Sequence, residues 1–441
     1  MVYMLVISIS IVSVVLGKFL LRKWLNHLTL YCFIWSGLIL LYELKLLPYP
    51  DISFRAWFYI ITTFLSFLMG IITFIGARNL YPGKPILDKS SNIDLPIFKD
   101  GGKAVKYALL FTSAIYIYAA IQNWLVLIRM FGSIPAVFLN ANYIYILNSK
   151  GGGIKGMVPF IAVFGYVAVF LSGIYTAYKG KFTFLTFLPL VGIIIRELAT
   201  VGRVGMLLAL LEFLFTFFLF RHLLNDDKSK RYKFSKKNAV ISFTVLLFLF
   251  VSSASIIRIV RGGAESFVGA NQQLSKLKGN FILSPSIYLY FSSDIGVLTK
   301  YFEYEPENTM FGQNTFLTVY HVLAKLNVLK RPSDFQKGYF IPMWTNTATF
   351  IRELHADFGV TGTFLIPYLL GLIITWLWFK FYCEKSFIVL TILVFLYLII
   401  GFSFLIMVTR IGYWSISQIL TIMCIPIIEK IANYNYRNSL S

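Results

Sequence analysis

Long apolar runs alternate with short polar stretches from one end of the chain to the other. Eleven of these runs are close to the roughly 20 residues that a helix needs to cross a hydrocarbon layer about 30 Å thick. They lie near residues 2–20, 28–47, 54–76, 107–128, 157–178, 182–198, 204–222, 239–257, 358–380, 386–408 and 411–430. The pattern predicts an all-α polytopic membrane protein with about 11 transmembrane helices.

The composition supports this fold class. Of the 441 residues, 58% are hydrophobic and 13% are charged, and the mean hydropathy is +0.74. Soluble proteins carry about 25% charged residues, so the composition excludes a water-soluble enzyme, a secreted disulfide scaffold and a disordered chain. Residues 2–20 are uniformly apolar with no small-residue cleavage site after them, which favours a retained span over a signal peptide.

The chain divides by hydropathy into three parts. Residues 1–257 hold eight predicted spans, residues 258–357 form one long polar loop, and residues 358–441 hold three more spans and a short tail. The loop contains an aromatic stretch at 281–291 and, at 316–329, apolar residues at helical spacing. We therefore expect short helices that lie on or near the membrane surface.

The net charge of +21 would suggest nucleic acid binding in a soluble protein. In a membrane protein it is first a topology signal, because basic residues collect in cytoplasmic loops. One set of loops holds 22 Lys and Arg residues, the opposite short loops hold 8, and the long loop holds 10. This distribution predicts an outside N-terminus, a cytoplasmic C-terminus and an outside long loop. The basic stretch 221–238 could be a lipid or nucleic acid patch, but an ordinary cytoplasmic loop explains it better.

The choice between Arg and Lys differs between the two sides. Arg accounts for 5 of the 22 basic residues predicted inside and for 9 of the 18 predicted outside. Because Arg grips phosphate or carboxylate through two parallel hydrogen bonds, this bias indicates a phosphate-bearing ligand. Six of the outer arginines lie at helix boundaries: Arg196, Arg203, Arg258, Arg261, Arg352 and Arg410. Each one alone is also explained by snorkelling or by capping of helix-terminal carbonyls.

Titratable groups concentrate in residues 352–357. On a helix, Arg352 and His355 share one face, and Glu353 and Asp357 share another. Such a cluster is able to hold an anion and to supply a general base near neutral pH. The alternative is a solvated helix start in which acidic residues favour the N-terminus.

Two segments carry a resemblance to a known family. They are RELATVGRVGMLLALLEF at 196–213 and TNTATFIRELHADFGVTGTFLIPYLLG at 345–371, where the element D-F-G-x-x-G leads into an apolar span. Together with the layout of spans and one large late loop, they resemble the bacterial oligosaccharide repeat-unit polymerases, the Wzy-type O-antigen and capsule polymerase family. The resemblance covers the layout of the whole chain, whereas the motifs cover these two segments.

The resemblance implies a GT-C-like fold in the bacterial cytoplasmic membrane and a metal-independent glycosyltransferase without a cofactor. The enzyme would move the growing glycan from undecaprenyl diphosphate onto a lipid-linked repeat unit, so donor and acceptor are both lipid-linked oligosaccharides. A chain-length regulator and a flippase are the implied protein partners, and no nucleic acid is expected. Cys32, Cys383 and Cys424 lie far apart and indicate neither a zinc site nor a disulfide framework.

This chemistry assigns roles to the candidate residues. The six boundary arginines would stabilise the diphosphate leaving group, and Glu353, His355 or Asp357 would orient or deprotonate the attacking hydroxyl. Tyr290, Tyr339 and Trp344 would stack on sugar rings, although aromatic residues are equally expected as membrane-interface anchors.

Three other functions remain open from the sequence. An O-antigen ligase would use the same donor with another acceptor. A flippase or transporter would favour repeated halves and broken helices near the midplane, and no clear internal repeat is present. A non-catalytic assembly component would leave the arginine bias unexplained.

Overall fold

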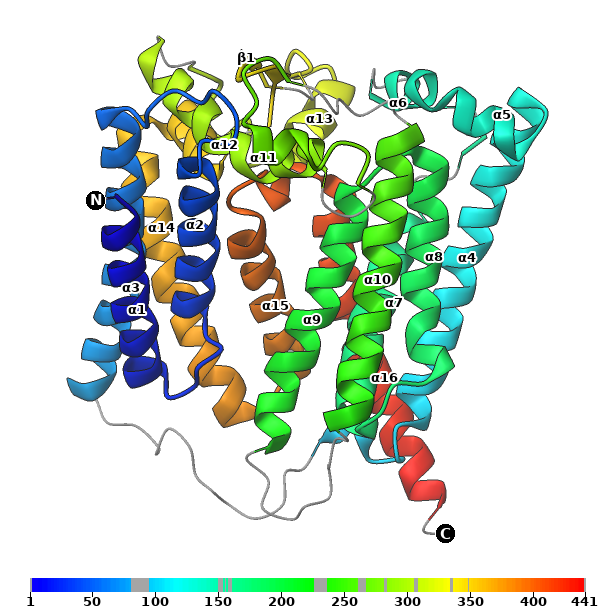
Figure 1. Ribbon diagram of the computed structural model, residues 1–441. Helices are drawn as coiled ribbons and strands as arrows, with labels where there is room; N and C mark the ends of the chain where they lie inside the picture. The colour runs from blue at the N-terminus through cyan, green and yellow to red at the C-terminus, as the bar shows by residue number, and fades with distance from the viewer. Residues whose placement is uncertain are drawn as a thin grey trace. The chain divides into compact units, whose positions relative to one another are not determined.

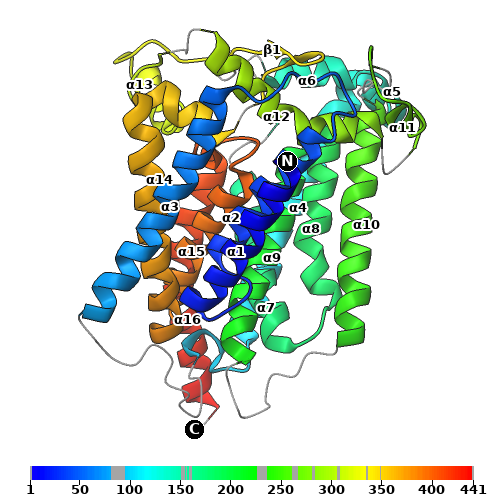
Figure 2. The same cartoon turned by 60° about the vertical axis from the view of Figure 1, so that its left-hand side comes forward.

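The computed structural model describes residues 2–80, 95–149, 154, 156–157, 161–225, 236–260, 267–280, 284–304, 308–333, 336–347 and 349–439. Over these residues the chain is mainly helical, and its strands form one hairpin of two residues on each side (Figures 1 and 2). The elements before the long loop are α1 (Val2–Leu21), α2 (His27–Glu43), α3 (Phe54–Leu80), η1 (Pro96–Phe98), α4 (Lys103–Phe131), α5 (Ile134–Leu139), α6 (Ala141–Ser149), α7 (Ala162–Lys179), α8 (Phe184–Thr200), α9 (Val204–Asn225) and α10 (Lys236–Val260). The elements that follow are α11 (Gln272–Ser275), α12 (Pro285–Glu303), α13 (Leu317–Lys325), β1 (Tyr339–Phe340), β2 (Trp344–Thr345), α14 (Phe350–Glu384), α15 (Phe387–Phe402), η2 (Val408–Arg410) and α16 (Gly412–Asn438).

The helices agree with the predicted fold class. Eight helices among the described residues are long and apolar enough to cross a membrane: α1, α3, α4, α7, α9, α10, α14 and α16. Two shorter apolar helices, α2 and α15, coincide with two further predicted spans, and α8 coincides with the span predicted at 182–198. The protein is therefore an all-α polytopic membrane protein.

The chain forms two compact units, each built from separate segments. Unit 1 comprises residues 1–84, 264–378 and 396–412, and unit 2 comprises residues 85–263, 379–395 and 413–441. These units follow three-dimensional contacts, whereas the division at 257 and 357 follows hydropathy and remains a prediction of membrane topology. The long loop contributes α11, α12, α13 and the antiparallel β1–β2 hairpin to unit 1.

In unit 1, helices α1 and α2 lie side by side and α12 packs on α2 (Figures 1 and 2). The side chain of Asn26 caps α2 by accepting a hydrogen bond from the Thr29 N–H at 2.9 Å. Tyr288 donates from its hydroxyl to the Leu41 carbonyl at 2.8 Å, and Tyr49 and Ser292 share a hydrogen bond at 2.7 Å. These polar contacts fix α12 against the end of α2 and the segment that follows it.

Helices α3 and α14 of unit 1 touch backbone to backbone. A Cβ at Gly70 would lie 2.1 Å from the Tyr368 carbonyl oxygen, and a Cβ at Gly371 would lie 2.2 Å from the Phe67 carbonyl oxygen. Small residues of this kind let membrane helices approach closely and gain dispersion contacts. The crossing at Gly70 and Gly371 therefore sets the distance between the two helices.

Unit 2 is organised around α7, whose residues are nearly all buried. Helices α4, α8 and α9 pack against it, and Figure 1 shows them running alongside one another. Close approach again depends on glycine. A Cβ at Gly165 would lie 2.5 Å from the Tyr116 ring, and one at Gly173 would lie 2.8 Å from Thr216.

The Gly70 contact can be tested with a matched pair of substitutions on α3. Gly70→Ala should lower the melting temperature of the detergent-solubilised protein, because the methyl group meets a backbone oxygen that cannot rotate away. We expect a loss of about 1–3 kcal/mol, the usual range for overpacking. Gly76→Ala is the control, since a Cβ there meets nothing within 4 Å. Equal melting temperatures for the two variants would contradict the tight crossing.

Candidate functional site

The first turns of α14 carry four of the predicted site residues. Arg352, Glu353, His355 and Asp357 all lie between the start of the helix and a kink at Gly359, where φ is 62° and ψ is −152°. Glycine adopts this positive φ without the steric penalty that a side chain would bring. The short helical segment before the kink is therefore a separate helix that differs in direction from the long apolar part of α14.

Asp357 accepts more hydrogen bonds than any other carboxylate among the described residues of unit 1. Its Oδ1 accepts from the Thr309 hydroxyl at 2.7 Å and from the Asn314 N–H and Nδ2 at 2.9 and 2.8 Å. Its Oδ2 accepts from the Thr315 N–H and hydroxyl at 2.7 and 2.8 Å. Five donors satisfy a carboxylate fully, so this side chain is suited to hold the 309–315 segment on α14. The geometry therefore favours Glu353 or His355 over Asp357 as the group that accepts a proton.

Glu353 lies in a second buried network. Its Oε1 accepts from Gln336 Nε2 at 2.9 Å and from Arg410 Nη1 at 3.3 Å, and its Oε2 accepts from the Met407 N–H at 2.7 Å. Arg410 Nη1 also donates to Asn314 Oδ1. Glu353 is 2% exposed and Arg410 is 7% exposed. Breaking such a buried pair is costly, so this network joins the 403–411 segment and the long loop to α14.

Arg352 and His355 meet a common partner, Tyr301 of α12. The Arg352 guanidinium lies over the Tyr301 and Tyr339 rings at 5.4 and 5.3 Å and donates from Nη2 to the Lys337 carbonyl at 2.7 Å. The Tyr301 hydroxyl lies 3.0 Å from His355 Nδ1. The shared face that the spacing predicts for Arg352 and His355 is therefore present.

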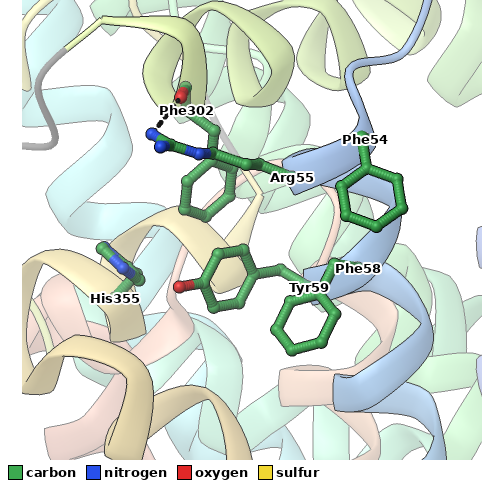
Figure 3. Close-up of a pocket in the computed structure, with 6 residues that line it drawn as sticks. All are labelled: Phe54, Arg55, Phe58, Tyr59, Phe302 and His355. Carbon is green, nitrogen blue, oxygen red and sulfur yellow. Dashed lines mark hydrogen bonds between the residues drawn. The ribbon is translucent and has the colours of Figure 1, made fainter.

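His355 lines a pocket of about 320 Å³ with residues of α3 and α12 (Figure 3). Its ring makes edge contacts with Tyr59 and Phe302, both at 5.1 Å between ring centroids. Arg55 projects along the same pocket and donates from Nη1 to the Phe302 carbonyl at 3.5 Å. The complete lining is Phe54, Arg55, Phe58, Tyr59, Phe302 and His355.

This pocket combines an imidazole, a guanidinium and aromatic walls. The 3.0 Å hydrogen bond between the Tyr301 hydroxyl and His355 Nδ1 accommodates either group as the donor. When Nδ1 carries the proton, it donates to the tyrosine oxygen, and Nε2 is the proton acceptor of the ring. Tyr59 and Phe302 stack in parallel, with centroids 4.3 Å apart. An acceptor nitrogen beside a cation and flat apolar surfaces suits a ligand with hydroxyl and anionic groups.

The three aromatic candidates occupy different surroundings in unit 1. Tyr339 is buried beneath Arg352 and stacks on Tyr304 at 6.0 Å. Trp344 is 65% exposed and covers Gly338. Tyr290 lies on α12 in edge contact with Phe291. None of the three is among the residues that line the described pocket.

The other arginines predicted to bind the diphosphate belong to unit 2 or fall outside the described residues. Arg196 pairs with Glu197 at 2.9 Å and lies 5.5 Å from the Tyr413 ring centroid. Arg258 is buried near the end of α10, and Arg203 lies half-buried in the turn between α8 and α9. Arg261 lies outside the described residues. The role of these four residues as a diphosphate clamp stays a prediction.

The ion pair of unit 2 explains two glycines of the segment that follows it. A Cβ at Gly202 would lie 2.5 Å from Glu197 Oε2, and a Cβ at Gly205 would lie 2.7 Å from the same carboxyl group. The glycine spacing of RELATVGRVG is thus a consequence of packing a buried carboxylate against the turn. It gives Arg196 a partner within its own unit.

Sequence reasoning did not identify several residues that complete the site. Four of them contact α14 from segments 17 to about 300 positions away: Asn314, Gln336, Tyr301 and Tyr59. Arg55 lines the same pocket as His355, and no local spacing encodes any of these positions. Arg55 is one of the nine arginines predicted outside, and its local sequence did not mark it as a site residue. Among the described residues, no group of three His, Cys, Asp or Glu side chains is arranged to hold a metal ion.

Helix α12 also buries an acidic residue, Asp294, which is 1% exposed. Burial raises the pKa of Asp294 to about 8, against a smaller opposing effect of the Thr347 hydroxyl. Its carboxyl group is therefore largely uncharged at neutral pH, the state in which a buried carboxyl group without an ion pair costs least.

Comparisons with protein-family models, with curated proteins and with solved structures find no match to this chain. The chemistry of the site is therefore argued from its own residues.

The structural role of Asp357 is open to a direct test. Asp357→Asn replaces one acceptor oxygen by a donor, so at least one buried N–H or hydroxyl group of the 309–315 segment loses its partner. We expect the free energy of unfolding to fall by about 2–3 kcal/mol and the segment to become sensitive to limited proteolysis. Asp51→Asn is the control, because the Asp51 side chain is fully exposed and pairs only with Lys45 among the described ion pairs. A melting temperature of Asp357→Asn equal to that of the control would remove the anchoring role.

Proposed function

We propose that the protein is a glycosyltransferase of the bacterial cytoplasmic membrane that joins lipid-diphosphate-linked oligosaccharide repeat units on the outer face. The observation that carries the proposal is the pocket in which His355, held by Tyr301, lies beside Arg55 and aromatic walls. The resemblance of residues 345–371 to the repeat-unit polymerases supports the same chemistry, because this segment supplies His355.

In this reaction a sugar hydroxyl of the acceptor attacks the anomeric carbon of the donor. The bond between that carbon and the phosphate oxygen breaks, and the lipid diphosphate leaves with the bonding electron pair. The hydroxyl proton passes to His355 Nε2, which acts as the general base. The positive charge of arginine stabilises the negative charge that develops on the leaving diphosphate.

The other two base candidates have supporting roles in this proposal. Asp357 holds the 309–315 segment, and Glu353 holds Gln336 and Arg410, so both keep the helix that carries His355 in place. The Arg352 guanidinium lies over the Tyr301 ring and supports it, and the Tyr301 hydroxyl in turn fixes the imidazole of His355. A precise base position matters because a misplaced group loses most of its catalytic advantage.

The proposal is tested by reconstituting the protein with a synthetic lipid-diphosphate repeat unit and following product length. The wild-type protein should form a ladder of glycans. His355→Gln should slow ladder formation by about 10²–10⁴-fold, the usual contribution of a general base, while the melting temperature stays unchanged. His321→Gln is the control, since His321 lies on α13 and does not line the pocket.

Each other product pattern of the wild-type protein replaces the proposal by another function. A single transfer to a different lipid acceptor would indicate a ligase. Movement of the lipid across the bilayer without a new glycosidic bond would indicate a transporter. Full activity of His355→Gln would remove His355 as the base.

Orientation is tested separately with alkaline phosphatase fusions, since this reporter is active only outside the cytoplasm. A fusion at Gln313 should be active, and a fusion at Lys230, in the basic stretch predicted inside, should be inactive. The reverse pattern would place the pocket on the cytoplasmic side and would exclude polymerisation on the outer face.

A further inference from the structure

The pocket beside His355 is lined by the N-terminal ends of α3 and α14 and by Phe302 near the C-terminal end of α12. Farther along, the same two helices are joined at 63 and 363, where the Thr63 hydroxyl donates to the Thr363 carbonyl at 3.3 Å, and at the Gly70–Gly371 crossing. Phe58 and Phe364 face one another in edge contact at 6.4 Å just beside the opening. The two helices are thus in close contact just beyond the pocket.

Apolar side chains continue from the pocket along the outer face of α3. Phe54 is 85% exposed and Phe58 is 44% exposed, although both line the pocket. Ile61, Leu65 and Met69 follow at intervals of three or four residues and are also about half exposed. At helical spacing these residues share one face, and a stripe of this kind on a membrane helix contacts hydrocarbon. The pocket therefore opens onto the lipid-facing side of unit 1.

Arg55 places a positive charge at the rim of this opening. Its side chain is exposed, and its Nη1 donates to the Phe302 carbonyl at 3.5 Å. Figure 3 shows the guanidinium above Tyr59, on the same side of the pocket as Phe302. Guanidinium groups bind phosphate oxygens through paired hydrogen bonds. A cation above an apolar stripe matches a molecule with a phosphate head and a hydrocarbon tail.

We propose that the outer ends of α3 and α14 form the seat of the lipid diphosphate, admitted sideways from the bilayer. Arg55 binds the phosphate, the first prenyl units lie against Phe54 and Phe58, and the attached sugar reaches His355. This inference rests on the proposed function for the identity of the lipid. It adds the route by which the substrate arrives and the residues that hold its tail, which neither the arginine bias nor the motif at 345–371 indicates.

The seat is tested by photo-crosslinking in the full-length protein reconstituted in nanodiscs. A photoreactive benzoylphenylalanine replaces Phe58, and the probe is a radiolabelled polyprenyl diphosphate disaccharide. We expect label on the protein after irradiation. The matched control carries benzoylphenylalanine at Ile121 of α4, which is 48% exposed on a membrane helix of unit 2, and it should remain unlabelled.

One further variant with its control tests the charge, and a shortened probe tests the tail. Arg55→Gln should reduce the labelling at position 58 about tenfold, which corresponds to about 1.4 kcal/mol of binding free energy. Arg129→Gln, at an exposed arginine in the last turn of α4, should leave it unchanged. A probe whose prenyl chain is cut to two units should label position 58 much more weakly, because it lacks the hydrocarbon that the stripe would contact.

The outcomes separate this inference from the proposed function. Ladder formation without labelling at position 58 would overturn the seat and leave the glycosyltransferase proposal standing. Strong labelling without any ladder would support the seat and overturn the polymerase. Equal labelling at positions 58 and 121, or full competition by the same concentration of phosphatidylglycerol, would show an ordinary lipid contact and overturn the seat.

Discussion

The hydrogen bonds to the Asp357 carboxylate are the constraint on which the candidate site depends. They bring the 309–315 segment onto the first turns of α14. That segment contains Asn314, whose amide oxygen accepts a hydrogen bond from Arg410. Arg410 in turn pairs with Glu353. A hydrogen bond to a charged group contributes roughly 1.5–3 kcal/mol, and a network of this kind is worth more intact than its parts suggest. One carboxylate therefore organises three segments that are distant in sequence.

The site separates into a closed part and an open part. The closed part consists of fully hydrogen-bonded polar groups around Glu353 and Asp357, which fix the geometry of the helix start. The open part is the pocket that His355 and Arg55 line. Rigid support on one side and access on the other is the arrangement that positions a reactive group while admitting a ligand. The two faces of the short helix before Gly359 supply the closed part and the His355 side of the open part.

The sequence was sufficient to predict the long apolar helices because their signal is local. Every one of the eleven apolar runs coincides with a helix, and eight of these helices are long and apolar enough to cross a membrane. The division of residues 352–357 into two faces followed from helical geometry in the same way, and both Arg352 and His355 do contact Tyr301. Local periodicity determines which side chains share a face.

The partners of those faces could not be predicted, because each arises from a contact over a long sequence distance. Nothing near Asp357 indicates that Thr309 and Thr315 will supply its donors, and nothing near His355 indicates Tyr59. The glycines are visible in the sequence, but only the structure shows why each position requires glycine. Gly202 and Gly205 make room for the Glu197 carboxylate, and Gly359 allows the kink after the site.

The interleaved segments of unit 1 have a consequence for how the protein is made. His27 hydrogen-bonds to Thr375, and the Trp35 indole N–H donates to Ser403. These hydrogen bonds of the N-terminal helices cannot form until residues more than 340 positions later have been synthesised. At usual rates of translation, that delay is on the order of tens of seconds. During this interval buried polar groups such as His27 would face lipid without their native hydrogen bonds. The nascent chain therefore depends on the insertion machinery, or on transient contacts, to keep the polar groups of its first helices away from lipid until synthesis is nearly finished.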